Sequence, residues 1–352
     1  MIIAPLDLLG DIGNGIISTV STILQLLQEN SFLLFKIIVF PGLFFIIMSA
    51  VALVWLERKM WGRIQDRRGP TYIGKFGTFQ LFADAVKLMS KETIIPSRAY
   101  KLMYRFLPIL NFLAVAIGIG LIPFSAEWAI GRSSVSLILV YALLTVIPVV
   151  GLLAGWASGS KYPLIGGLRF ASQQFSFEVP LLLSAVAPAM LAGSIDLMTI
   201  SQSQSIIWFV LLAPLSFVTF IIASIAELSK VPLDMPDADA EIVWGWRTEY
   251  TGIYFLLYYF AQYLELFLFT GMATALFLGG GYGIPFLPHV VTYLIKMFGL
   301  SLVIIVLTSS LHRVRMDQLL RMCWRLLLPL TLLNLAAIML LLGYYPQILS
   351  IL

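Results

Sequence analysis

The 352-residue chain is 60% hydrophobic and only 11% charged, with a formal net charge of +4. Charged residues usually make up about 25% of a soluble domain, so this composition excludes one and indicates a protein with many membrane spans. One cysteine, Cys323, and two histidines, His289 and His312, are too few ligands for an iron–sulfur, haem or zinc site within the chain. We therefore expect this chain alone to bind no metal or cofactor.

Residues 1–31 begin without a positively charged region or a small-residue cleavage site, so they do not resemble a signal peptide. Apolar residues recur at helical spacing between Asp11 and Glu29. This pattern predicts a short helix in the outer membrane interface, and a plain anchor would explain it equally well. We expect 1–31 to be an outer interfacial segment and 32–352 to be a single membrane domain.

Eight apolar runs follow, each close to the roughly 20 residues that a helix needs to cross the bilayer core. They are continuous instead of alternating, which favours an all-α integral membrane protein over a β-barrel. The predicted spans cover residues 32–56, 106–126, 135–156, 170–192, 206–226, 253–278, 290–311 and 324–344. An even number of spans places both termini on the same side.

Lysine and arginine set the orientation, because short loops rich in them stay on the cytoplasmic side. Nineteen of the 22 lie in or beside the segments that follow the first, third, fifth and seventh spans. We therefore expect inside loops at 57–105, 157–169, 227–252 and 312–323. The chain is then a multi-pass protein of the inner (plasma) membrane, with basic loops in the cytoplasm and both termini outside.

The first inside loop contains an amphipathic segment at residues 79–91. Its apolar face comprises Phe79, Phe82, Val86 and Met89. Its polar face comprises Gln80, Asp84, Lys87 and Lys91. The pattern predicts a helix that lies on the membrane surface. The positive-inside rule alone would also account for the many basic residues of this loop.

Three glutamates fall within or at the end of predicted spans: Glu178, Glu227 and Glu265, the last with Gln262 on the same helical face. A charge at the centre of a bilayer costs about 2.5–3.5 kcal/mol on insertion scales unless it faces a cavity or a partner. Such residues indicate a proton or ion pathway, with helix–helix hydrogen bonding as the simpler alternative. A stand-alone secondary transporter would use the same glutamates as its ion site.

The stretch "AELSKVPLDMPDADAEIVWGWRTEY" at 226–250 holds six of the eighteen acids. Pro232 and Pro236 disfavour a regular helix until after Pro236. Acids this close repel one another, so some of their pKa values would be raised if the loop folded back toward the membrane. A solvated acidic loop is the alternative, but the tryptophans of "VWGW" favour an interfacial or buried setting.

Ordered motifs along residues 36–346 resemble subunit 1, or H, of respiratory complex I, the proton-pumping NADH:quinone oxidoreductase. They are "ERK…RRGP" (57–70), "ADAVKL" (83–88), "AGWASGSKYPLIGGLR" (154–169), "FEV" (177–179), "AELSKVPLD" (226–234), "PDADAE" (236–241), "TEYTG" (248–252) and "RVRMDQL" (313–319). The resemblance implies a membrane subunit at the junction with the electron-carrying arm, enclosing most of a tunnel for a lipid-soluble quinone.

The same resemblance implies the substrate and the partners. A quinone, or methanophenazine in archaeal-type relatives, is the expected substrate, while iron–sulfur clusters and flavin are held by partner subunits. The expected partners are the iron–sulfur subunits of the hydrophilic arm, antiporter-like membrane subunits and membrane lipids, and no nucleic acid. The chain would couple quinone reduction to proton translocation without being the redox catalyst of the oxidoreductase.

Two groups of site residues are expected in this framework. The quinone tunnel or its junction comprises Arg58, Arg67, Arg68, Asp84, Arg169, Lys230, Arg313 and Arg315. The proton path comprises Glu57, Glu178, Glu227, Asp234, Asp237, Asp239, Glu241, Glu249, Gln262 and Glu265.

Several positions depart from the common pattern of this family. "PDADAE" replaces "PEAESE", Gln262 and Phe177 replace a common Glu and Tyr, and Lys230 replaces an arginine, which loses bidentate binding. Glu265 is our candidate substitute for the missing glutamate. The departures leave reduced deazaflavin or ferredoxin open as donors beside NADH. A hydrogenase-linked ion-pumping complex is the alternative, although the intact "RRGP", "ADAVKL" and "RVRMDQL" motifs favour a quinone-type enzyme.

Overall fold

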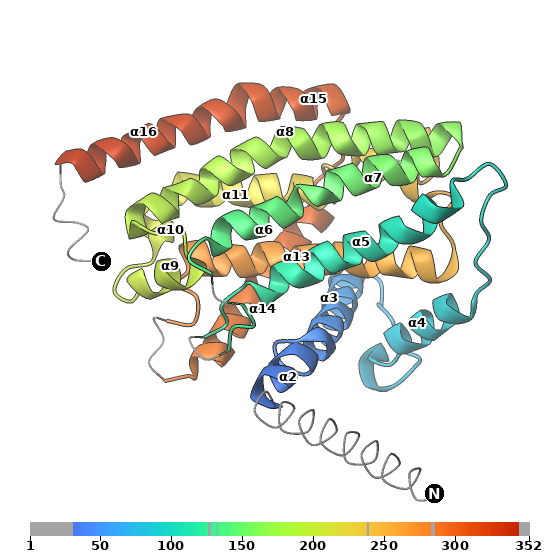
Figure 1. Ribbon diagram of the computed structural model, residues 1–352, viewed down its shortest axis with the longest axis horizontal. Coiled ribbons are helices and arrows are strands. Elements are labelled where there is room, and N and C mark those ends of the chain that lie inside the picture. Colours follow the sequence, from blue (N-terminus) through green and yellow to red (C-terminus); the bar gives the residue numbers. More distant parts are fainter. Residues whose placement is uncertain (1–30, 126–127, 132, 238, 283–285, 345–352) are drawn as a thin grey trace, which may run out of the picture.

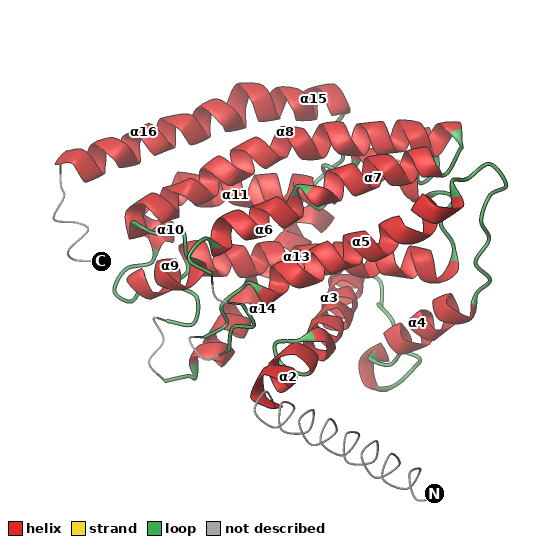
Figure 2. Ribbon diagram, viewed as in Figure 1, coloured by secondary structure: helices red, strands yellow, loops and turns green. Residues whose placement is uncertain are grey.

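The computed structural model describes residues 31–125, 128–131, 133–237, 239–282 and 286–344. Over these residues the protein is built from helices, with no strand (Figures 1 and 2). The all-α fold class predicted from the continuous apolar runs is thereby confirmed. The outer helix predicted between Asp11 and Glu29 lies outside the described residues.

The helices form a bundle in which the axes of α5, α7, α8 and α13 are roughly parallel, with α7 running opposite to the other three and α15 and α16 along one edge (Figure 1). Their bounds are α2 Ser31–Ile38, α3 Leu43–Ile64, α4 Gln80–Ser90, α5 Lys101–Gly120, α6 Ser136–Leu144, α7 Val146–Ala157, α8 Lys161–Ala192, α9 Leu197–Ser203, α10 Phe209–Leu212, α11 Pro214–Glu227, α12 Asp239–Ile242, α13 Gly252–Phe277, α14 His289–Ser310, α15 Met316–Met322 and α16 Leu328–Tyr344.

Within the described ranges, seven helical stretches are long and apolar enough to cross a membrane, so the predicted count of eight is not confirmed. The exception is the predicted span 206–226. It divides into α10 and the 14-residue α11, with Ala213 between them. Pro214 lacks a backbone N–H and disfavours the helical conformation of the residue before it, which explains the break.

Several helices extend beyond the predicted spans, most clearly α3 and α8. Helix α3 continues past Leu56 to Ile64, and α8 starts at Lys161 and continues through Pro180 and Pro188 to Ala192. Parts of the predicted loops 57–105 and 157–169 are therefore helical. Hydropathy marks the bilayer core, whereas the end of a helix is set by its backbone hydrogen bonds, so the two boundaries need not coincide.

Helix α13 lies at the centre of the bundle. Every residue from Tyr263 to Phe277 is buried, and α13 packs against α3, α5 and α14. Helix α8 forms a second centre, in contact with α7, α11 and α16. The segment that follows α11 is bonded to both helices, through Gln173 of α8 and Gln262 of α13, and its residues 226–230 are buried.

The starts of α5, α8 and α13 gather on the right of Figure 1, together with the loop from α7 to α8, and we call this the basic end. Helix α4 also lies on this side. At the basic end Gly166 of α8 touches the backbone of the acidic loop, and a Cβ there would lie 2.5 Å from the Trp246 nitrogen. A larger residue at 166 would therefore displace the loop.

Candidate functional site

A polar cavity of about 760 Å³ opens at the basic end, between the last turns of α3, residues 67–72 and the first half of α13. Its lining comprises Glu57, Arg58, Trp61, Arg67, Arg68, Gly69, Pro70, Thr71, Tyr72, Tyr259 and Tyr263. Four of the expected site residues thus share one cavity, three from the tunnel group and Glu57 from the proton-path group. The "ERK…RRGP" motif brings them together, because α3 carries its first half and the following turn folds back.

A smaller, mostly apolar cavity of about 330 Å³ lies between α3, α4 and α13. Arg58 and Tyr259 line both cavities, so the two share a wall. The Arg58 Nη1 atom donates to Asp84 Oδ2 at 2.6 Å, which ties α4 to α3 at this wall. An amphipathic molecule would therefore find a polar chamber beside an apolar one.

The predicted amphipathic helix is confirmed as α4. Leu81, Ala85 and Leu88 face the apolar cavity, whereas Phe82 and Val86 are exposed. The exposed apolar face is the one that the sequence assigned to the membrane.

Glu57 connects the polar cavity to the acidic loop. Lys230 Nζ donates to Glu57 Oε2, and the two side chains are only 8% and 9% exposed. The same ammonium lies 4.5 Å from the centre of the Tyr263 ring. A buried charge pair of this kind is stable only as a pair, because either partner alone would remain desolvated.

Two further ion pairs fasten the acidic loop to other elements, and a third lies within the loop. Arg313 binds Asp234 with two hydrogen bonds, Nε–Oδ1 at 2.5 Å and Nη2–Oδ2 at 2.7 Å, and the adjacent Val314 nitrogen donates to the Pro232 oxygen at 3.0 Å. The remaining two pairs join Arg247 to Asp237 at 3.8 Å and Arg169 to Glu241. Three tunnel-group cations, Lys230 included, thus pair with path-group acids, so many members of the two expected groups lie in one cluster.

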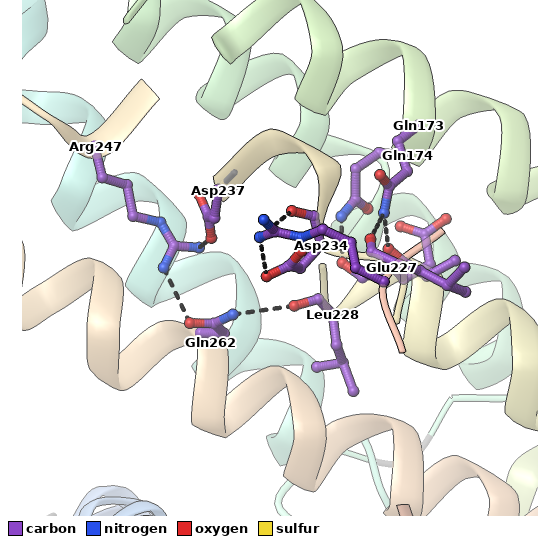
Figure 3. Close-up of polar contacts among 11 residues, drawn as sticks. Gln173, Gln174, Glu227, Leu228, Asp234, Asp237, Arg247 and Gln262 are labelled. Carbon is purple, nitrogen blue, oxygen red and sulfur yellow. Dashed lines mark hydrogen bonds and ion pairs between the residues drawn. The ribbon is translucent and has the colours of Figure 1, made fainter. Parts of the chain in front are cut away.

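Arg247 is a central residue that the sequence interpretation did not single out. It is buried, its Nη1 donates to Gln262 Oε1 at 3.0 Å, and Gln262 Nε2 donates to the Leu228 oxygen at 3.0 Å (Figure 3). A carboxylate at 262 could not donate to that carbonyl, so the glutamine suits its place. The signal was available, since Arg247 and Lys230 are the only cations of the 226–250 stretch.

Two glutamines of α8 fasten the end of α11 (Figure 3). Gln173 Nε2 donates to the oxygens of Ala226 at 2.7 Å and Leu233 at 2.6 Å, and Gln174 Nε2 donates to the Glu227 oxygen. The last carbonyls of a helix lack partners within the helix, and these amides supply them. The Glu227 backbone is therefore held, whereas its side-chain Oε1 is buried without a hydrogen-bond partner.

The other two glutamates of the spans are less closely paired than the acids of the loop. Thr145 Oγ1 donates to Glu178 Oε1 at 2.5 Å. Glu265 is buried in α13 beside Asn111 and within electrostatic reach of Arg247. Glu227 lies within electrostatic reach of both Glu178 and Glu265, so the three form one group.

Some expected site residues lie apart from this cluster. Arg315 is exposed at the start of α15. Glu249 lines a separate pocket with Arg98 and Lys161, and its backbone oxygen accepts from Tyr104 at 2.6 Å. The side chain of Asp239 is outside the described part of the chain.

Tyr259 and Tyr263 were also missed by the sequence interpretation. They lie one turn apart on α13, line the polar cavity, and their hydroxyls are 3.3 Å apart. Helical spacing within an apolar run gave no reason to separate them from ordinary core residues.

The chain is similar to known proteins over most of its length. The family model described as NADH dehydrogenase matches residues 36–339. The H subunit of NADH-quinone oxidoreductase from Dehalococcoides mccartyi is 38% identical over 291 residues, 83% of this chain and 82% of that protein. The H subunit from Geobacillus kaustophilus is 39% identical, covering 79% and 85%. An H subunit from Geobacter metallireducens is 38% identical, covering 83% and 92%.

Proposed function

The chain belongs to the family of NADH-quinone oxidoreductase H subunits, which are membrane subunits of complex I, and we propose that it encloses the quinone and couples the reduction of that quinone to proton translocation. The observation that carries the proposal is the polar cavity at the basic end, which lies beside an apolar cavity at Arg58 and is linked to the acidic loop through Glu57.

The two cavities suit the two parts of a quinone. The polar chamber, at about 760 Å³, offers arginines and tyrosines that can donate hydrogen bonds to carbonyl oxygens of a headgroup. The apolar chamber between α3, α4 and α13 suits an isoprenoid tail. A phenazine ring with the same kind of tail fits the same division. The electrons would come from clusters held by partner subunits.

Coupling follows from the charge that reduction places beside the cavity. Reduction of a quinone adds two electrons, and the headgroup carries negative charge until two protons follow and form the quinol. This transient charge changes the electrostatic field at Glu57 and its partner Lys230. That pair is joined through residues 228–237 to Arg247, and Glu227 lies at the start of the same segment. The protonation of Glu227 can respond, and its neighbours Glu178 and Glu265 would pass the signal to the antiporter-like partners.

Orientation and the electron donor complete the proposal. We place the basic end in the cytoplasm and both termini outside, counting α10 and α11 together as the eighth crossing. Partner subunits that co-purify with the chain identify the donor, through a nicotinamide, deazaflavin or ferredoxin site. A hydrogenase among them, with no quinone or phenazine reduction, would instead establish the hydrogen-linked alternative.

The Glu227→Gln variant tests the coupling. Because it removes the proton but keeps the side-chain shape, we expect proton translocation in membrane vesicles to fall by about 100-fold, the low end for a positioned proton-transfer group. Electron transfer to a water-soluble acceptor should stay unchanged. Glu92→Gln is the matched control, since Glu92 is exposed and belongs to neither expected group of site residues. Full pumping with normal quinone reduction by Glu227→Gln would contradict the role.

The Ala85→Trp variant tests the tunnel. Ala85 lines the apolar cavity, so an indole there occupies the space assigned to the tail. We expect the KM for a long-tailed quinone to rise, with a smaller rise for a tail-less analogue. Ala83→Trp, on the same helix but outside the cavity lining, serves as the control. An equal effect on both quinones would rule out a tail site here.

A further inference from the structure

A third cavity, of about 340 Å³, lies on the other side of residues 67–71 from the polar cavity. Its lining comprises Trp55, Leu56, Lys59, Met60, Arg63, Arg67, Arg68, Gly69, Thr71, Phe76 and Leu302. Arg67, Arg68, Gly69 and Thr71 also line the polar cavity, so this segment forms a wall between the two. We call this third cavity the groove. Its far wall is formed by Leu302 of α14, whereas the far wall of the polar cavity is formed by α13.

The charge of this groove is one-sided. Lys59, Arg63, Arg67 and Arg68 line it, and no carboxylate does. Lys59 Nζ donates to the Pro70 oxygen at 2.7 Å and Arg67 Nε to Gln65 Oε1 at 2.9 Å, both neutral acceptors. Over the described ranges none of the four cations takes part in an ion pair. The polar cavity, in contrast, is lined by an acid, Glu57, which forms an ion pair with Lys230.

The apolar and charged parts of the groove follow the order of a lipid. Along α3, Trp55, Leu56 and Met60 come before Arg63, so the apolar lining lies toward the bilayer centre and the charges toward the basic end. Leu302 of α14 completes the apolar part. Trp55 Nε1 donates to the Phe76 oxygen at 3.2 Å, which holds residues 71–77 over the groove.

We propose that this groove binds an anionic phospholipid, with its phosphate among Lys59, Arg63, Arg67 and Arg68 and one acyl chain along Trp55 and Leu302. The positive-inside rule explains why cations follow a span. It does not explain why four of them line one groove that contains no acid and is otherwise mostly apolar. Because Arg67 and Arg68 belong to the shared wall, the bound phosphate would also hold one side of the polar cavity in place.

Photo-crosslinking in the assembled complex tests the site. The complex is reconstituted in phosphatidylcholine nanodiscs that contain phosphatidylglycerol with a photoreactive acyl chain, and adducts are mapped by peptide mass spectrometry. The yield at residues 55–60 is divided by the yield at Leu333, an exposed residue of α16. One cation near an anionic lipid changes binding by about fivefold, so Arg63→Gln should lower this ratio by about fivefold.

Three comparisons make the result decisive. Arg63→Lys should restore most of the ratio, and Lys87→Gln, on exposed α4 and outside the groove, should leave it unchanged. Photoreactive phosphatidylcholine should give no preference for residues 55–60. Equal labelling by the two lipids, an unaltered ratio in Arg63→Gln, or no adduct because a neighbouring subunit covers the groove would each overturn the proposal. Arg63 does not line the polar cavity, so the outcome is independent of the quinone assignment.

Discussion

The acids of the loop and the acids of the spans are held in opposite ways. Glu57, Asp234, Asp237 and Glu241 each face a lysine or arginine. Glu227, in contrast, has a buried oxygen without a hydrogen-bond partner, and Glu178 is bonded to a neutral threonine. The expected proton-path group therefore contains two kinds of acid, those paired with a cation and those without such a partner.

A carboxylate paired with a cation is stabilised as an anion and keeps its charge. A buried carboxylate without such a partner carries the full cost of desolvation and can bind a proton instead. The loop acids therefore fasten the site, and Glu227 is the span glutamate whose setting best supports the proton-transfer role proposed above. Each prediction below removes one fastener, and the expected loss decreases with the exposure of the pair.

Lys230→Met should have the largest effect. It leaves Glu57 buried without a counter-charge, which costs about 3–5 kcal/mol. We expect a large drop in the melting temperature of the purified complex or a failure to assemble. The double variant Glu57→Gln with Lys230→Met should recover most of the loss, because no charge is then buried. Losses that simply add would show that the two side chains are not a pair.

Arg247→Met should have the next largest effect. It removes the cation facing Asp237 and the hydrogen bond to Gln262, at a cost of about 2–3 kcal/mol for a buried charged donor. The melting temperature of the complex should fall clearly. Arg247→Lys keeps the charge but cannot bridge both partners. The stability of this variant should therefore lie between that of Arg247→Met and that of the unaltered complex. A lysine variant as stable as the original protein would dismiss the bridging role.

Arg313→Lys should have a smaller effect, because one of the two hydrogen bonds to Asp234 can persist. We expect a loss of about 1 kcal/mol, the typical net value of one hydrogen bond. The measurement is again thermal melting, with Arg321→Lys on exposed α15 as the control. A change of the same size in both variants would mean that bidentate binding of Asp234 adds nothing.

Arg169→Gln should have the smallest effect. Its side chain is 30% exposed and that of Glu241 is 52% exposed, and ion pairs near the surface contribute about 0–1 kcal/mol. We expect a melting temperature close to that of the unaltered complex, and little dependence on salt. A loss as large as that of Lys230→Met would break the ordering by exposure and place Glu241 among the essential fasteners.

Several local features followed directly from the sequence. The spacing of Phe82 and Val86 against Asp84 predicted helix α4, and Pro232 and Pro236 predicted the irregular start of the acidic loop, where only a 3₁₀ turn at Met235–Asp237 forms. The division at Pro214 could have been inferred in the same way. Hydropathy averaged over a window hid it, because both α10 and α11 are apolar.

The sequence by itself determined that this protein is embedded in a lipid bilayer and that its secondary structure is helical. A chain that is 60% hydrophobic must bury its backbone polar groups in helices within the bilayer, whatever its partners. Only the tertiary structure decided which acids carry a counter-charge. Glu57 and Lys230 are 173 positions apart, and no periodicity relates them. Their pairing depends on the tertiary packing that brings α3 beside the segment after α11, where Tyr263 of α13 also contacts the Lys230 ammonium.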